Sequence, residues 1–123
     1  MNCLLISHKL ERNQDELIAF LRRHHVEVDT AEDQWNGLHK AHQKQYDVVV
    51  LDAESVGDPI DGAIRLLRDC NPMVRIIVQA EKNSRDLEAA ARKEKIFFYH
   101  VTSFGKKEIK TALSYALGLK QDA

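Results

Sequence analysis

The sequence predicts an α/β protein of three layers, with a doubly wound, parallel five-stranded sheet in the order 2-1-3-4-5 between two layers of helices. Five short runs rich in β-branched and aromatic residues alternate with longer stretches of helical periodicity, which is typical of repeated βα units. Right-handed crossovers between five such units favour this strand order. All 123 residues, 1–123, are expected to form a single domain.

The five predicted strands span residues 3–7, 26–30, 47–51, 74–78 and 96–101. The runs around Leu5, Val49 and Ile77 are almost continuously apolar, as strands covered on both faces must be. The run at 26–30 alternates apolar and polar residues instead. It is therefore expected to be an edge strand.

Apolar residues at helical spacing predict a helix after each strand. The core-facing positions of the five helices are Leu17, Phe20 and Leu21; Trp35, Leu38 and Ala41; Ala63, Ile64 and Leu67; Leu87, Ala90 and Ala91; and Ile109, Ala112, Leu113, Ala116 and Leu117. Asn71 and Pro72 end the third helix, because the residue before a proline disfavours helical backbone angles.

The charge balance predicts no general attraction to nucleic acid or to a membrane surface. The 18 basic and 19 acidic residues leave a formal net charge of -1. The apolar run at 1–6 is too short for a secretory leader, and no run is long enough to span a membrane. Cys3 and Cys70 are expected to serve packing in a reducing compartment, so a cytoplasmic location is expected.

Polar residues that follow four of the predicted strands should meet at the carboxyl edge of the sheet, where ligands bind in such folds. The residues at this edge include Ser7 and His8, Asp52, Gln79 and Thr102. The segment YDVVVLDAES at 46–55 resembles the third strand and phosphoacceptor turn of the receiver domains of bacterial two-component response regulators. The order of elements resembles this family over most of the chain, including Gly57 after the acceptor and Tyr99 with Phe104 around the fifth strand.

The resemblance implies a flavodoxin-like receiver fold with Asp52 at the phosphoacceptor position. Ser7 and His8 stand where the family has an acidic pair that helps to hold Mg²⁺, and neither supplies an anionic oxygen. Thr102 replaces the lysine that neutralises the phosphoryl charge, and Gln79 replaces a hydroxyl residue. Tyr99 occupies the position of the family's switch aromatic.

These departures favour a degenerate receiver, or pseudo-receiver, that signals through protein contacts, without enzymatic activity and without a cofactor. Its expected partner is a protein such as a histidine kinase-related signalling protein. A homodimer is also expected, through the fourth helix, fifth strand and fifth helix, where Phe97, Phe98, Tyr99 and Phe104 gather.

Two alternatives to the degenerate receiver remain open. In the first, Asp52 is phosphorylated with Glu11 or Glu54 helping to bind Mg²⁺ and Lys106 supplying charge. The stretch at 4–17 is similar to the start of divergent receivers in enhancer-binding transcription activators, so the chain would then be the N-terminal regulatory domain of a longer activator. The second alternative is a small α/β hydrolase or ligand-binding domain in which His8 and Asp52 form an acid/base couple.

Simpler structural interpretations accompany two of these residues. Asp52 could be a solvated carboxylate at a strand end with an ordinary pKa. Tyr99 could be a half-buried residue of an edge strand.

Overall fold

The structure is a computed structural model that describes residues 1–8, 15–56 and 59–119. Its elements are β1 (Asn2–Ile6), α2 (Asp15–Arg23), β2 (Glu27–Ala31), α3 (Gln34–Gln43), β3 (Val48–Asp52), η1 (Ala53–Ser55), α4 (Ile60–Cys70), β4 (Arg75–Ala80), α5 (Arg85–Arg92), β5 (Phe98–Val101), η2 (Thr102–Phe104) and α6 (Lys107–Leu117), where η denotes a 3-10 helix. Glu11 and Gly57 lie outside the described residues.

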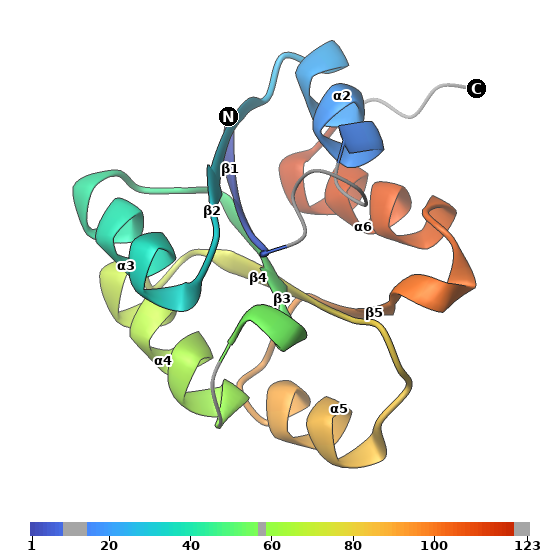
Figure 1. Cartoon of the computed structure of the whole chain (residues 1–123). Coiled ribbons are helices and arrows are strands. Elements are labelled where there is room, and N and C mark those ends of the chain that lie inside the picture. Colours follow the sequence, from blue (N-terminus) through green and yellow to red (C-terminus); the bar gives the residue numbers. More distant parts are fainter. Residues whose placement is uncertain (9–14, 57–58, 120–123) are drawn as a thin grey trace.

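The five strands form one parallel sheet in the order β2-β1-β3-β4-β5, which confirms the predicted topology (Figure 1). Each strand begins and ends within two residues of its predicted limits. The third and fourth strands continue further than predicted because Asp52 pairs with Gln79 in register, so the ladder extends to these polar residues. The second strand lies at an edge, as its alternating sequence predicted.

Helices cover both faces of the sheet and bury two separate apolar clusters (Figure 1). On one face α3, α4 and α5 pack over residues such as Leu4, Val49 and Ile76. On the other face, α2 and α6 cover Leu5, Ile77 and the other strand residues whose side chains point to this face. Successive strand residues point to opposite faces, so each central strand supplies both clusters. No helix within the described residues is long and apolar enough to cross a membrane.

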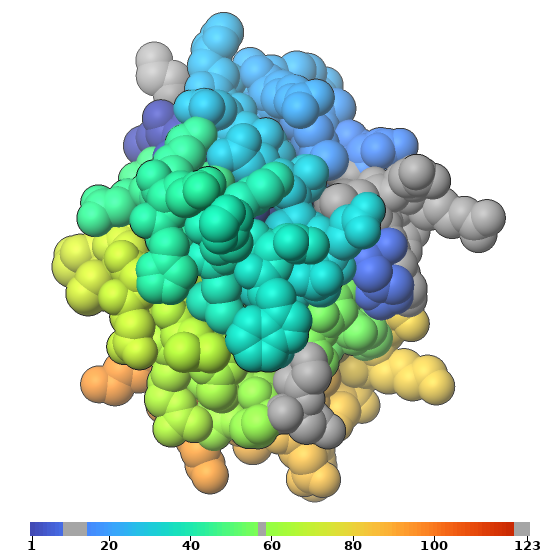
Figure 2. Space-filling model, turned by 60° about the vertical axis from the view of Figure 1, so that its left-hand side comes forward, coloured from blue at the N-terminus to red at the C-terminus, as the bar shows by residue number. Residues whose placement is uncertain are grey.

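The prediction for Trp35 was wrong, because its side chain is 67% exposed rather than packed on the sheet. The N-terminal cap of α3 is Asp33, whose carboxylate accepts the Asn36 amide, and the buried residues of the helix are Gly37 and Ala41. Two residues along an α-helix turn the side chain by about 200°. Trp35, two residues before Gly37, therefore faces away from the sheet. Figure 2 shows the side of the molecule on which α3 and α4 lie together.

The close approach of α3 to the sheet depends on Gly37. A Cβ atom at this position would lie 2.4 Å from Cδ1 and 2.8 Å from Cγ1 of Ile6. Ile6 is 1% exposed, so its side chain has little room to move away. The glycine is therefore required for packing between α3 and β1 rather than for an unusual backbone angle.

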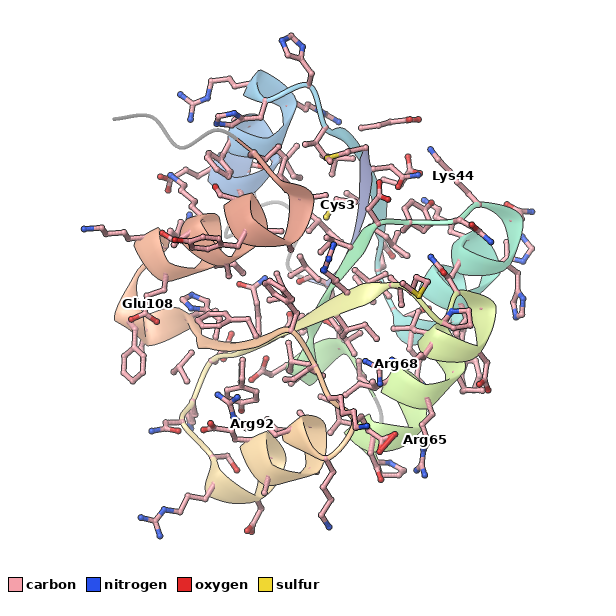
Figure 3. The ribbon with its side chains drawn as sticks, turned by 180° about the vertical axis from the view of Figure 1, so that it is seen from behind. Cys3, Lys44, Arg65, Arg68, Arg92 and Glu108 are labelled. Atoms are coloured by element: carbon pink, nitrogen blue, oxygen red, sulfur yellow. The ribbon has the colours of Figure 1, made fainter. Side chains whose placement is uncertain are left out.

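A polar network supports the exposed edge formed by β2. The Tyr46 hydroxyl donates to Asp29 Oδ2 at 2.7 Å, and Lys44 Nζ lies 3.2 Å from the same oxygen and 2.7 Å from Glu27 Oε1. Figure 3 labels Lys44 beside this edge of the sheet. The hydrogen bond from Tyr46 and the ammonium of Lys44 hold the pKa of Asp29 below its ordinary value, against the effect of burial.

The two cysteines are free, and Cys3 is buried in β1 (Figure 3). Burial, with a smaller contribution from the Asp47 charge, raises the pKa of Cys3 to about 12. Cys70 is partly exposed at the end of α4, and burial and the nearby Asp69 charge also raise its pKa. A raised pKa keeps both thiols protonated and unreactive near neutral pH.

Candidate functional site

Asp52 ends the central strand β3 and is 6% exposed, so the expectation of a solvated carboxylate was wrong. Its Oδ2 atom accepts hydrogen bonds from the Ser7 hydroxyl at 2.9 Å and the Ser55 hydroxyl at 3.2 Å. Its Oδ1 atom accepts the Glu54 amide at 3.2 Å and thereby caps η1. Both oxygens of the predicted acceptor are thus engaged by neighbouring donors.

The Asp52 carboxyl also departs from the ordinary pKa that was expected. Burial would by itself raise this pKa, because it disfavours the charged form. Hydrogen bonding with the Glu54 side chain, the Ser7 hydroxyl, the Glu54 amide and the Ser55 hydroxyl outweighs burial and lowers the pKa. The site therefore stabilises an ionised carboxylate.

His8 contacts Ser55, which stands between the imidazole and Asp52. The Ser55 hydroxyl oxygen accepts the His8 amide at 2.8 Å and lies 2.6 Å from His8 Nδ1. The predicted direct couple of His8 with Asp52 is therefore replaced by a chain that runs through Ser55. Sequence reasoning missed this serine. The available signal was its place three residues after Asp52, because Asp and Ser in turns bond nearby groups.

Glu54 brings a second carboxylate to the edge, as the phosphorylatable alternative required. Its Oε1 atom accepts the Glu81 amide at 2.9 Å, across the gap from the loop after β3 to the loop after β4. Gln79, on β4 beside Asp52, is 5% exposed. Glu81 was not among the predicted site residues. It contributes its backbone amide, and the types of side chain in the sequence do not indicate which backbone amides take part in a site.

Tyr99 is 6% exposed, so the interpretation of a half-buried edge residue was wrong. Although β5 is an edge strand, the ring belongs to the cluster beneath α3, α4 and α5. The Tyr99 hydroxyl and His100 Nδ1 are buried atoms without a hydrogen-bond partner among the described residues. Burial and the charges of Glu88 and Glu54 raise the pKa of Tyr99.

The position expected to hold a lysine is occupied by Thr102, the first residue of η2. Lys106, considered as a substitute, lies 3.2 Å from Glu16 Oε2, and Lys110 lies 2.7 Å from Glu16 Oε1. These ion pairs direct Lys106 toward α2. Asp52 therefore gains no ammonium from this residue in the observed arrangement.

The side chains of Ser7 and His8 beside Asp52 differ from the acidic pair that the resemblance implies for holding Mg²⁺. Mg²⁺ favours hard oxygen ligands in near-octahedral geometry, usually with carboxylates. Ser7 already donates its proton to Asp52, and His8 offers an imidazole. Among residues 1–8, 15–56 and 59–119, no group of three or more His, Cys, Asp or Glu side chains is arranged to hold a metal ion.

Comparison with known proteins establishes the fold. The chain matches no protein-family model and no curated protein. Solved structures similar to it include a CheY-like response regulator receiver domain from Methanospirillum hungatei, with a TM-score of 0.83, 13% identity and coverage of 95% of this chain and 93% of that chain.

Two other solved structures similar to this chain are also response regulators. A response regulator from Burkholderia pseudomallei, described with a phosphorylated aspartic acid, a calcium ion and citrate, has a TM-score of 0.72, 23% identity and coverage of 95% and 69%. A DNA-binding response regulator of the LuxR family from Staphylococcus aureus has a TM-score of 0.78, 13% identity and coverage of 94% and 98%. The chain therefore has the flavodoxin-like fold of receiver domains.

Proposed function

We propose that this chain is a degenerate receiver, a non-enzymatic signalling module of the cytoplasm that acts through protein contacts with little or no Mg²⁺-dependent phosphorylation of Asp52. The observation that carries the proposal is the state of the Asp52 carboxylate. Both of its oxygens accept hydrogen bonds from Ser7, Ser55 and the Glu54 amide. The chain keeps the fold of receiver domains, but Ser7, His8 and Thr102 replace the acidic pair and the lysine that would assist phosphoryl transfer.

Charge supports the same conclusion. A transferring phosphoryl group carries negative charge that a metal ion and a cationic side chain must offset. At this edge the chain supplies Thr102 in place of a cation, while Lys106 is paired with Glu16. The Glu54 side chain adds a second carboxyl group beside Asp52 and brings no cation. A phosphoryl group would therefore be poorly stabilised.

The proposal is tested by incubating the protein with acetyl phosphate and Mg²⁺ and measuring its intact mass. We expect no phosphate adduct on the natural sequence. A variant combining Ser7→Asp, His8→Asp and Thr102→Lys restores the missing carboxylates and the ammonium, and it is expected to form an adduct at Asp52. An adduct on the natural sequence that disappears in Asp52→Asn would overturn the proposal.

The proposed contact surface is the face formed by α5, β5 and α6, with a second copy of the chain as its occupant. A hollow of about 570 Å³ lies along β5 and α6, lined by Phe97, Phe98, Lys107, Glu108, Thr111, Ala112 and Tyr115. Phe97 and Tyr115 are 41% and 69% exposed. Lys107 and Glu108 are lining residues of opposite charge, so a two-fold pairing can place the lysine of one copy against the glutamate of the other. Figure 3 labels Glu108 on α6.

The predicted aromatic group does not form one continuous patch on this surface. Phe98 packs with the cluster under α2 and α6, whereas Tyr99 points to the opposite face and is buried. Phe104 is 62% exposed in η2. Alternation along the strand separates neighbouring aromatic side chains, so Phe97, Phe98 and Tyr115 define the hollow instead.

The dimer surface is tested by sedimentation velocity over a range of protein concentrations. We expect the natural sequence to associate as concentration rises, and Tyr115→Ala to weaken this association at least tenfold, as loss of a central aromatic contact does. Trp35→Ala is the matched control, since Trp35 is 67% exposed on the other side of the sheet. A monomeric natural protein at high concentration, or equal effects of the two variants, would exclude this surface.

A regulatory role in transcription is a second candidate. It is supported by the likeness of the start of the chain to receivers of transcription activators and by the DNA-binding regulator among the similar structures. In this role the same α5, β5 and α6 face would transmit the signal to another domain. Its net charge of -1 gives the chain itself no general attraction to DNA.

A further inference from the structure

Glu54 joins two loops that lie far apart in the sequence. Its backbone amide donates to Asp52 Oδ1 at 3.2 Å, and its carboxylate accepts the Glu81 amide at 2.9 Å. Glu81 directly follows β4, whereas Glu54 lies in η1 directly after β3. One acidic residue therefore contacts the predicted acceptor and also holds the start of the neighbouring loop.

The carboxylate of Glu54 accepts its hydrogen bond just beyond the ends of β3 and β4. Asp52 and Gln79 are in register, so β3 and β4 end side by side. The bond from the Glu81 amide to Glu54 therefore joins the two segments that follow these neighbouring strands.

The charge of Glu54 also acts on the groups around it. The Glu54 side chain helps to lower the pKa of Asp52 through a hydrogen bond, whereas its charge contributes to the raised pKa of the buried Tyr99. The electrostatic influence of Glu54 therefore extends from β3 to β5. Backbone N–H groups in loops are effective anion donors, which explains how the Glu81 amide retains a carboxylate.

We propose that the Glu54 side chain is an internal tether that fixes the loop after β4 in one arrangement. Only a short connection separates Glu81 from Ser84, whose hydroxyl caps α5 by accepting the Leu87 amide at 3.3 Å. Restraining Glu81 consequently restrains the start of α5. A role of this restraint in signalling rests on the proposed function. The restraint itself depends only on the hydrogen bond between Glu54 and the Glu81 amide.

The restraint is tested by NMR amide exchange at Glu81 in three variants of Glu54. Glu54→Ala removes the acceptor, and Glu54→Asp keeps the charge but is one methylene too short to reach. Both are expected to speed exchange at Glu81 about tenfold, as loss of a charge-assisted hydrogen bond does, and to shift the amide signals of 84–88. Glu54→Gln keeps a side-chain oxygen and is expected to retain most of the protection.

Glu88→Ala is the matched control. Glu88 is another acid near Tyr99, but it pairs with Arg92 within α5 at 2.7 Å. We expect it to leave exchange at Glu81 unchanged. Unaltered exchange and α5 signals in both Glu54→Ala and Glu54→Asp would overturn the inference.

The two proposals fail in different ways. A phosphate adduct on the natural sequence contradicts the degenerate receiver, while exchange at Glu81 still reports whether Glu54 restrains the loop. Conversely, absence of an adduct together with unchanged exchange in the Glu54 variants rules out the Glu54 tether and leaves the degenerate receiver standing.

Discussion

Replacing Gly37 by alanine should destabilise the fold by about 1–2 kcal/mol. Overpacking a buried contact costs about 1–3 kcal/mol, while alanine recovers up to about 1 kcal/mol of helix propensity relative to glycine. The added Cβ would lie 2.4 Å from Ile6 Cδ1, within a side chain that is 1% exposed. The free energy of unfolding in urea measures the loss.

Gly62 provides the matched control, since a Cβ atom added at this position in α4 would meet, among the residues that the structure describes, only Pro59 Cγ, at 3.8 Å. Gly62→Ala should therefore stabilise the protein by roughly 0.5–1 kcal/mol. Ile6→Val removes the clashing Cδ1 atom, so its usual cost of about 0.5–1.5 kcal/mol should shrink when combined with Gly37→Ala. Equal stabilisation by both glycine substitutions would contradict the proposed packing contact.

Replacing Asp29 by alanine should cost about 1–3 kcal/mol, because it leaves the Tyr46 hydroxyl without its acceptor. Tyr46 is 3% exposed, and its hydroxyl donates to Asp29 Oδ2 at 2.7 Å. Glu27→Ala is the control, since Glu27 is the more exposed partner of Lys44 and should contribute less than about 1 kcal/mol. Adding Tyr46→Phe to Asp29→Ala should recover part of the loss by removing the unpaired hydroxyl.

The pH dependence of unfolding provides a second measure of Asp29. Its pKa is lowered in the folded state, chiefly by the Tyr46 hydrogen bond, so its contribution is present above the unfolded pKa of about 3.9. This contribution is lost as pH falls through the folded pKa. Urea unfolding at several pH values should therefore show a shallower loss of stability below about pH 4 in Asp29→Ala. A parallel pH profile would exclude Asp29 as a contributor.

His100 affects stability in a different pH window. Burial lowers its pKa, despite opposing effects of Glu108 and the Gly105 backbone. A histidine that favours the neutral form when folded loses stability as pH falls below its unfolded pKa of about 6.5. This window is separate from that of Asp29, so the two contributions can be distinguished in one titration.

The sequence predicted the architecture well because periodicity reports burial directly. The continuous apolar runs of β1, β3 and β4 required cover on both faces, and the alternating run of β2 required an edge. Trp35 was misplaced because helical spacing alone does not determine which small residues approach the sheet. Gly37 and Ala41 form the side of α3 that faces the sheet. This orientation is possible because Gly37 has no Cβ atom that would collide with Ile6.

The sequence also placed Ser7, His8, Asp52, Gln79 and Thr102 at one sheet edge, since strand ends converge in a parallel sheet. It did not predict that Asp52 would be buried or that its pKa would be lowered. Those properties depend on which hydroxyl and amide groups surround the carboxylate. Ser55 in particular is placed by the turn of η1, so it can reach both His8 and Asp52.

Thus the amino-acid pattern alone determined the strand order and the identity of the residues at the carboxyl edge, because both follow from periodicity and chain connectivity. Only the tertiary structure decided how those residues pair. The contact of Glu54 with the Glu81 amide joins groups 27 residues apart, and its donor is a backbone atom that every residue type except proline possesses. Hydrogen bonds of this kind depend on atomic positions, which side-chain chemistry along the chain does not specify.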